Sequence, residues 1–145
     1  MKQSHHQLSL SIAVSPESAW KIIGGADGVD QWFAPVIACR VEGNKRYCET
    51  ADGAFSEDIL EVNHDTRVFK YAIPNQNLLP VSNIIGSMQV SDAPNGHAIV
   101  SWSWSFEVEA AVETDAKEAL NTMGNMGIKG IESVIKTQEA TASIH

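Results

Sequence analysis

The sequence predicts an α+β fold in which an antiparallel sheet of about seven strands is covered by a long C-terminal helix, with two short helices after the first strand. Three observations support this prediction. Residues 114–138 repeat apolar side chains at the helical period. Residues 8–14 alternate apolar and small polar side chains, as a strand with one buried face does. Between residues 36 and 109, short strand-like runs are separated by turn residues.

The first strand and the two short helices can be placed from their end signals. After the alternating segment 8–14, Ser15 is a suitable N-cap and Pro16 a suitable first helical residue, and the pair Gly24-Gly25 then ends the helix. Residues 29–33 indicate a second helical turn, which a following proline stops. Two short helices are therefore expected between the first and second strands.

The middle of the chain predicts six more strands joined by short turns. They are expected near residues 36–42, 45–50, 54–63, 67–73, 82–91 and 97–109. Consecutive strands joined by tight turns pair antiparallel. One face of such a sheet needs a cover, and the C-terminal helix is the only segment long enough to provide it.

The C-terminal helix has an unusual apolar face. Leu120 and Ile131 share one side of the helix, whereas the opposite side is charged. Three glycines, Gly124, Gly127 and Gly130, lie in its interior. Each should cost about 1 kcal/mol relative to alanine. Either another backbone comes close to them, or side-chain volume is left out where space is needed.

Composition excludes several classes of partner. The 145 residues are 43% hydrophobic, enough for one domain spanning 1–145 with a sizeable core. A net charge of −8 disfavours nucleic acid and anionic surfaces. No apolar run is long enough to span a bilayer, and the N-terminus leads directly into a strand, so we expect a soluble cytoplasmic protein. Cys39 and Cys48 are expected to be buried thiols rather than a disulfide.

Several motifs occur in an order that resembles a known family. They are Ser15-Pro16-Glu17 with Trp20, Trp32 ahead of Pro35, Arg46, Asp58 with Leu60, Tyr71, Leu79-Pro80, Trp102 with Phe106, and Gly127-Ile128. In this order they resemble the START-like superfamily, also called SRPBCC or helix-grip proteins, and within it the bacterial polyketide cyclase/dehydratase-like group. The resemblance implies a curved sheet that grips the last helix, with an apolar ligand cavity between them. Trp104 stands where relatives usually have a small residue, and its indole would shrink that cavity.

An ion pair is expected across the third and fourth strands. A three-residue loop closed by Thr50 and Ala54 would pair Arg46 with Asp58. Alternation places Asp58 on the face of Leu60, which we take as the inner face. The pair could then hold a carboxylate, carbonyl or hydroxyl group of a ligand, or it could be a purely structural salt bridge. A two-residue turn closed by Ala51 and Ala54 would instead shift the register by one residue and break the pair.

The candidate ligand-binding residues come from the inner faces of the strands, the loop at 74–80 and the helix. They are Arg46, Asp58, Leu60, Phe69, Tyr71, Leu79, Pro80, Ile84, Met88, Trp102, Trp104, Met123 and Gly127. These side chains could equally form a well-filled aromatic core. In the resembled family the loop at 74–80 lies over the cavity mouth, where it could act as a lid or be a plain connector.

No catalytic or cofactor signature is present in the sequence. The histidines, at positions 5, 6, 64, 97 and 145, lack metal-site spacing, so we expect no metal and no cofactor. Asp58 is the only inward carboxylate expected, with Tyr71 as a potential proton donor. The leading hypothesis is binding of an apolar small molecule, which could be lipid-, polyketide- or aromatic-like. The alternative is a cyclase, dehydratase or isomerase acting in the same cavity. We expect no nucleic-acid partner and allow for a homodimer.

Overall fold

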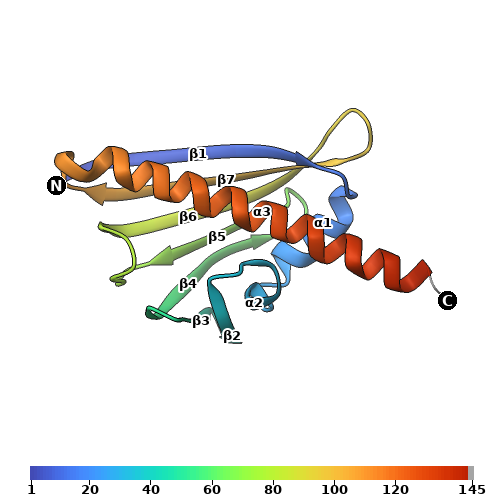
Figure 1. Cartoon of the computed structure of the whole chain (residues 1–145), viewed down its shortest axis with the longest axis horizontal. Helices are drawn as coiled ribbons and strands as arrows, with labels where there is room; N and C mark the ends of the chain where they lie inside the picture. The colour runs from blue at the N-terminus through green and yellow to red at the C-terminus, as the bar shows by residue number, and fades with distance from the viewer. Residues whose placement is uncertain (144–145) are drawn as a thin grey trace.

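The computed structural model describes residues 1–143 (Figure 1). Seven strands, three α-helices and one 3₁₀ turn follow one another along these residues. Their order is β1 (Lys2–Ile12), α1 (Pro16–Gly24), α2 (Val29–Trp32), β2 (Val36–Glu42), β3 (Lys45–Thr50), β4 (Gly53–Asn63), β5 (Val68–Ile73), β6 (Val81–Asp92), β7 (Ala98–Val108), η1 (Ala110–Val112) and α3 (Glu113–Ser143). The predicted α+β class and the order of elements are confirmed. His145, one of the five histidines considered above, lies outside the described residues.

All seven strands form a single antiparallel sheet, in the order β1-β7-β6-β5-β4-β3-β2. Neighbouring strands are consecutive in the chain except at one edge, where β1 pairs with β7. The edges of the sheet are therefore β1 and β2. Figure 1 shows α3 lying along the sheet, while α1 and α2 occupy the space between the end of β1 and the β2 edge. The main hydrophobic core lies between the sheet and these helices.

Local end signals account for the helices. Ser15 caps α1, because its hydroxyl oxygen accepts a hydrogen bond from the Ser18 backbone amide at 3.1 Å.

The C-terminal helix α3 has 31 residues, and it extends beyond the predicted 114–138 at both ends. No helix within residues 1–143 is long and apolar enough to cross a membrane.

The register between β3 and β4 corrects one prediction. The hairpin closes on Thr50 and Gly53 through a two-residue turn, and not on Thr50 and Ala54. The shorter loop moves β4 by one residue, so that Arg46 is opposite Glu57 and Asp58 is opposite Lys45. The predicted Arg46–Asp58 pair is therefore wrong, and Glu57 occupies the inner face in its place.

The three glycines of α3 are sites of close packing. A Cβ atom on Gly130 would lie 1.8 Å from the backbone oxygen of Trp32 at the end of α2. On Gly127 it would lie 2.8 Å from Cζ3 of Trp102, and on Gly124 it would lie 2.7 Å from Cη2 of Trp104. Both explanations offered by the sequence therefore apply: a backbone approaches Gly130, whereas indole rings occupy the space beside Gly124 and Gly127.

Replacing Gly130 by alanine should destabilise the protein, although alanine is normally the better helix former. The added methyl group would overlap the α2 backbone, so we expect Gly130→Ala to lower the free energy of unfolding by about 3 kcal/mol. Gly124→Ala is the comparison and should cost less, because the nearest neighbour of the added methyl group is the end of the Leu8 side chain and not backbone. Urea denaturation followed by circular dichroism measures both. A Gly130→Ala protein as stable as the wild type would contradict this packing.

Candidate functional site

A small space, here called the chamber, lies between the sheet and helices α2 and α3. Its volume is about 70 Å³. Apolar side chains form most of its wall, and among its lining residues are Trp32, Val36, Met88, Trp102, Trp104, Leu120 and Met123. The rings of Trp102 and Trp104 stack with centroids 5.0 Å apart. These indoles, packed below the α3 glycines, account for the small size of the chamber.

A larger apolar cleft, here called the vestibule, adjoins the chamber. Its volume is about 430 Å³, and it lies between α3, the β3–β4 turn and the loop at 74–80. The residues that line both spaces are Phe33, Phe55, Ile73, Leu79, Ile84 and Met123. A molecule in the vestibule would therefore be separated from the chamber only by these side chains.

The loop at 74–80 is organised by one side chain. The Gln76 carboxamide oxygen accepts hydrogen bonds from the backbone amides of Leu78 and Leu79, at 2.8 Å each. The carboxamide nitrogen donates to the carbonyl oxygens of Leu79 at 3.0 Å and Val81 at 2.8 Å. This network holds Leu79 at the boundary between vestibule and chamber, and Leu78 on the vestibule wall.

A buried ion pair forms the polar part of the chamber wall. Arg46 and Glu57 are side by side on β3 and β4, with side chains only 7% and 6% exposed. Arg46 Nε donates to Glu57 Oε1, and Nη1 donates to the carbonyl oxygen of Ala26 at 2.8 Å. The guanidinium also lies 4.9 Å from the ring centre of Phe69. Burial disfavours the charged guanidinium, but the adjacent Glu57 carboxylate outweighs this effect and raises the pKa of Arg46.

Tyr71 places a hydroxyl group in the same wall. Its oxygen accepts a hydrogen bond from Trp102 Nε1 at 3.0 Å. Gly86 is directly opposite Tyr71 in the sheet, and a Cβ atom there would lie 2.1 Å from Cζ of the ring, so only glycine leaves room for it. Burial, followed by the nearby Glu57 charge, raises the pKa of Tyr71. The phenol therefore stays protonated at neutral pH.

Three polar side chains lie in this wall, those of Arg46, Glu57 and Tyr71. Among their hydrogen bonds within residues 1–143, Arg46 Nε donates to Glu57, Arg46 Nη1 donates to the Ala26 carbonyl oxygen, and Trp102 Nε1 donates to the Tyr71 oxygen. All three residues line the chamber. The chamber thus offers donors from Arg46 and Tyr71 and an acceptor from Glu57 to a small polar group.

The structure brings together most of the predicted site residues, though not all of them. Of these, Arg46, Tyr71, Leu79, Ile84, Met88, Trp102, Trp104 and Met123 line the chamber. Phe69 is buried behind Arg46, and Gly127 is packed against Trp102. Pro80 is exposed at the end of its loop and lines neither space.

Asp58 and Leu60 were predicted to line the site, but the structure places both outside it. Asp58 forms an outward salt bridge with Lys45 at 2.7 Å, and Leu60 is 53% exposed. The one-residue change of register moved both away from the chamber. Sequence reasoning also missed Glu57, although its alternation with Phe55 and Ile59 was a usable signal. Phe33, directly after α2, and Leu120, on the apolar face of α3, also line the chamber and were not among the predicted residues.

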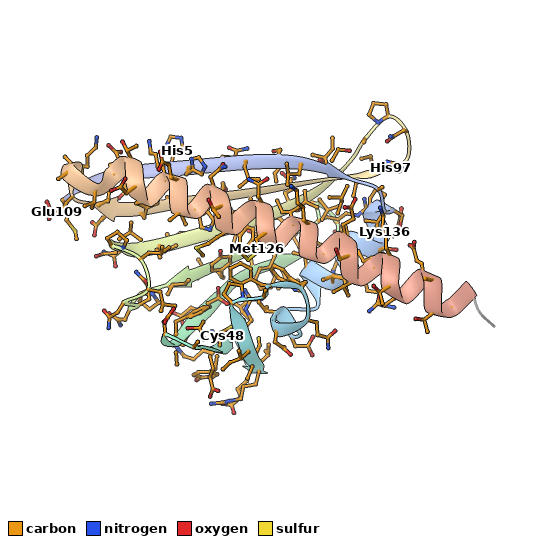
Figure 2. The ribbon with its side chains drawn as sticks, in the orientation of Figure 1. His5, Cys48, His97, Glu109, Met126 and Lys136 are labelled. Atoms are coloured by element: carbon orange, nitrogen blue, oxygen red, sulfur yellow. The ribbon has the colours of Figure 1, made fainter. Side chains whose placement is uncertain are left out.

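Metal-binding groups do not converge in the described part of the chain. Figure 2 shows His5 on β1 and His97 in the β6–β7 turn, near opposite ends of the β1 edge. No group of three or more His, Cys, Asp or Glu side chains that could hold a metal ion is found within residues 1–143.

Comparison with known proteins agrees with this geometry. Residues 5–136 match a family model described as polyketide cyclase / dehydrase and lipid transport. The chain belongs to this family. The match spans the sheet and most of α3, and it confirms the resemblance to polyketide cyclase-like helix-grip proteins. A search of curated proteins found no match.

Two solved structures of other proteins share the helix-grip fold. One is an uncharacterised protein from Bacillus thuringiensis, with 24% identity and a TM-score of 0.82, covering 91% of this chain and 98% of that chain. The other is the protein XoxI from Bacillus cereus, with 24% identity and a TM-score of 0.83, covering 94% of this chain and 98% of that chain. At this identity the likeness shows the fold alone.

The adjacent carboxylates Glu57 and Asp58 provide a direct test of the site. Glu57→Gln should lower the free energy of unfolding by about 3 kcal/mol, because it leaves the buried Arg46 charge without its counter-ion. Asp58→Asn should leave the midpoint of urea denaturation nearly unchanged, because its partner Lys45 is solvated. Equal losses for the two variants would mean that the register described here does not hold in solution.

Proposed function

We propose that the chain binds an apolar small molecule that carries a neutral oxygen at one end. The observation behind this proposal is an apolar vestibule that shares six lining residues with a chamber whose wall carries three polar side chains, Arg46, Glu57 and Tyr71. Ligand sites in proteins are commonly about 300–1,000 Å³. The vestibule, at about 430 Å³, is in this range, whereas the chamber, at about 70 Å³, accommodates only a few atoms. The apolar body would therefore occupy the vestibule and the oxygen would enter the chamber.

The charges of the chamber favour a neutral polar group over an acid. Arg46 and Glu57 neutralise each other, so the wall has no net charge to balance a ligand carboxylate. A carboxylate beside Arg46 would also be repelled by Glu57. A ketone, ester or alcohol oxygen can accept from Arg46 or Tyr71 without this repulsion. The aromatic rings of Phe33 and Phe55 on the vestibule wall suit an aromatic, polyketide-like or acyl body.

A second candidate is an enzyme of the cyclase, dehydratase or isomerase type. Its specific support is that Tyr71, a protonated phenol, and Glu57, a carboxylate, line the same chamber. Such a pair could donate a proton to a carbonyl oxygen and accept one from an adjacent carbon. Asp58, the carboxylate expected for this role, points away from the chamber. Turnover that is lost in Tyr71→Phe, while ligand binding persists, would favour this candidate over simple binding.

A matched pair of ligands tests the role of the oxygen. We expect 2-acetylnaphthalene to bind about 3- to 10-fold more tightly than 2-isopropenylnaphthalene, which has a similar shape without the oxygen, because one hydrogen bond is gained. Quenching of the tryptophan fluorescence measures both affinities. In Tyr71→Phe the difference should shrink, and thermal unfolding of that variant checks that it remains folded. Equal affinities in the wild type would refute recognition of a neutral oxygen.

Two methionines on α3 test where the ligand lies. Met123 lines both the chamber and the vestibule, whereas Met126, three residues further along, is 41% exposed. Met123→Trp should fill the route and weaken binding of 2-acetylnaphthalene at least tenfold, while Met126→Trp should bind like the wild type. Native mass spectrometry of the purified protein then reports whether a co-purified apolar compound disappears in Met123→Trp. Undiminished binding in that variant would exclude this cleft as the site.

A further inference from the structure

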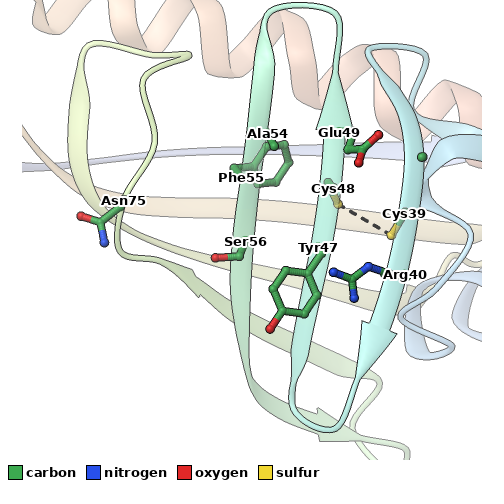
Figure 3. A pocket seen from close by; sticks show the side chains of 10 residues that line it. Cys39, Arg40, Tyr47, Cys48, Glu49, Ala54, Phe55, Ser56 and Asn75 are labelled. Atoms are coloured by element: carbon green, nitrogen blue, oxygen red, sulfur yellow. Dashed lines mark hydrogen bonds between the residues drawn. The ribbon is translucent and has the colours of Figure 1, made fainter.

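Two cysteines face each other on the β2 edge of the sheet, and the proposed function does not use them. Cys39 on β2 and Cys48 on β3 are direct partners in the register. Their Sγ atoms are 3.7 Å apart, and both are free thiols (Figure 3). They are the only cysteines in the sequence.

The hairpin geometry places this pair where a cross-strand bond can form. β2 and β3 are joined by the two-residue turn Gly43-Asn44, closed by Glu42 opposite Lys45. Such a turn closes on a hydrogen-bonded pair, and pairs alternate along antiparallel strands, so Cys39 and Cys48 form a non-hydrogen-bonded pair. The Cα atoms of such pairs are about 4.5 Å apart, within the range of disulfides, and the sulfur atoms need to approach by about 1.7 Å.

The two thiols differ in their access to solvent. Cys48 is 1% exposed and lines the chamber, and burial raises the pKa of its thiol. Cys39 is half-buried and, unlike Cys48, lines an open hollow of about 340 Å³ beside α1 and α2, together with Ile22 and Trp32. A small oxidant therefore reaches Cys39, and Cys48 is positioned behind it to react second.

We propose that Cys39 and Cys48 form a peroxide-sensitive dithiol that oxidises to an intramolecular disulfide. In the first step the Cys39 sulfur attacks one oxygen of hydrogen peroxide, the O–O bond breaks, and Cys39 sulfenic acid and one water form. In the second step the Cys48 sulfur attacks the Cys39 sulfur, the S–O bond breaks, and a second water leaves with the Cys48 proton. Two thiols are oxidised by two electrons in total, and one peroxide is reduced to two waters.

The bond would join the edge of the sheet to the wall of the chamber. β2 is an edge strand, hydrogen-bonded within the sheet only to β3, and it carries Val36 on the chamber wall. Cys48 lines the same chamber. Oxidation would fasten β2 to β3 beside the chamber, so the thermal unfolding midpoint should rise in the oxidised protein.

The test uses the full chain, freed of reductant and treated with a small excess of hydrogen peroxide. We expect titratable thiols under denaturing conditions to fall from two to none, and the intact mass to drop by two hydrogen atoms. Peptide mapping should show Cys39 linked to Cys48, and dithiothreitol should reverse the change. This outcome does not depend on the proposed ligand, because no ligand is added.

Two single variants distinguish the role of Cys39, which reacts with peroxide, from that of Cys48, which then forms the disulfide. In Cys48→Ser, the Cys39 sulfenic acid should persist and be trapped by dimedone. In Cys39→Ser, the remaining buried thiol should react at least tenfold more slowly than the wild-type protein. The proposal is overturned if both thiols survive in folded wild-type protein, if oxidation yields sulfinic acid or a dimer linked between chains, or if Cys39→Ser reacts as fast as the wild type.

Discussion

The contact between α3 and the end of α2 sets the dimensions of everything that lies beneath it. Gly130 allows the helix to rest against the backbone of Trp32, and Gly127 and Gly124 allow it to lie directly over Trp102 and Trp104. Interiors pack to near-crystalline density, so this close approach leaves little empty volume. The chamber of about 70 Å³ is what remains once the indoles are in place. A helix with larger side chains at these positions would stand further from the sheet.

The ion pair of Arg46 and Glu57 is the second constraint, and it contributes more to the candidate site than to the free energy of unfolding. Removing both charges from water costs several kcal/mol per ion, which their attraction and hydrogen bonds must offset. An apolar pair would fill the same space without that cost. Together with Tyr71, however, the pair provides directed donors and an acceptor in a wall that is otherwise apolar. This arrangement orients a ligand through a few polar atoms while burial supplies most of the binding energy.

Two readings of the same cavity, binding and catalysis, differ in what Glu57 and Tyr71 do after a ligand has entered. Both begin with an apolar body in the vestibule and an oxygen beside the ion pair. In the binding reading, the hydrogen bonds form once and remain. In the enzymatic reading, the phenol and the carboxylate exchange protons with the ligand, which requires a reacting carbon close to Glu57. The description of the family to which the chain belongs includes both cyclase/dehydrase activity and lipid transport. Family membership alone therefore does not distinguish catalysis from binding.

The sequence by itself determined the elements, their order and the layered architecture. Those features follow from local rules: the period of apolar residues, the Ser15 cap, the turn residues and the helical pattern of α3. It also determined most of the apolar lining, because strand alternation assigns a whole face at once.

Only the tertiary structure decided which carboxylate pairs with Arg46. A loop one residue shorter than expected exchanged Asp58 for Glu57, because a shift of one residue turns each side chain of the strand to the other face. The size of the chamber was likewise decided in three dimensions, because it depends on how glycines of α3 and tryptophans of α2 and β7, distant in sequence, fill one volume.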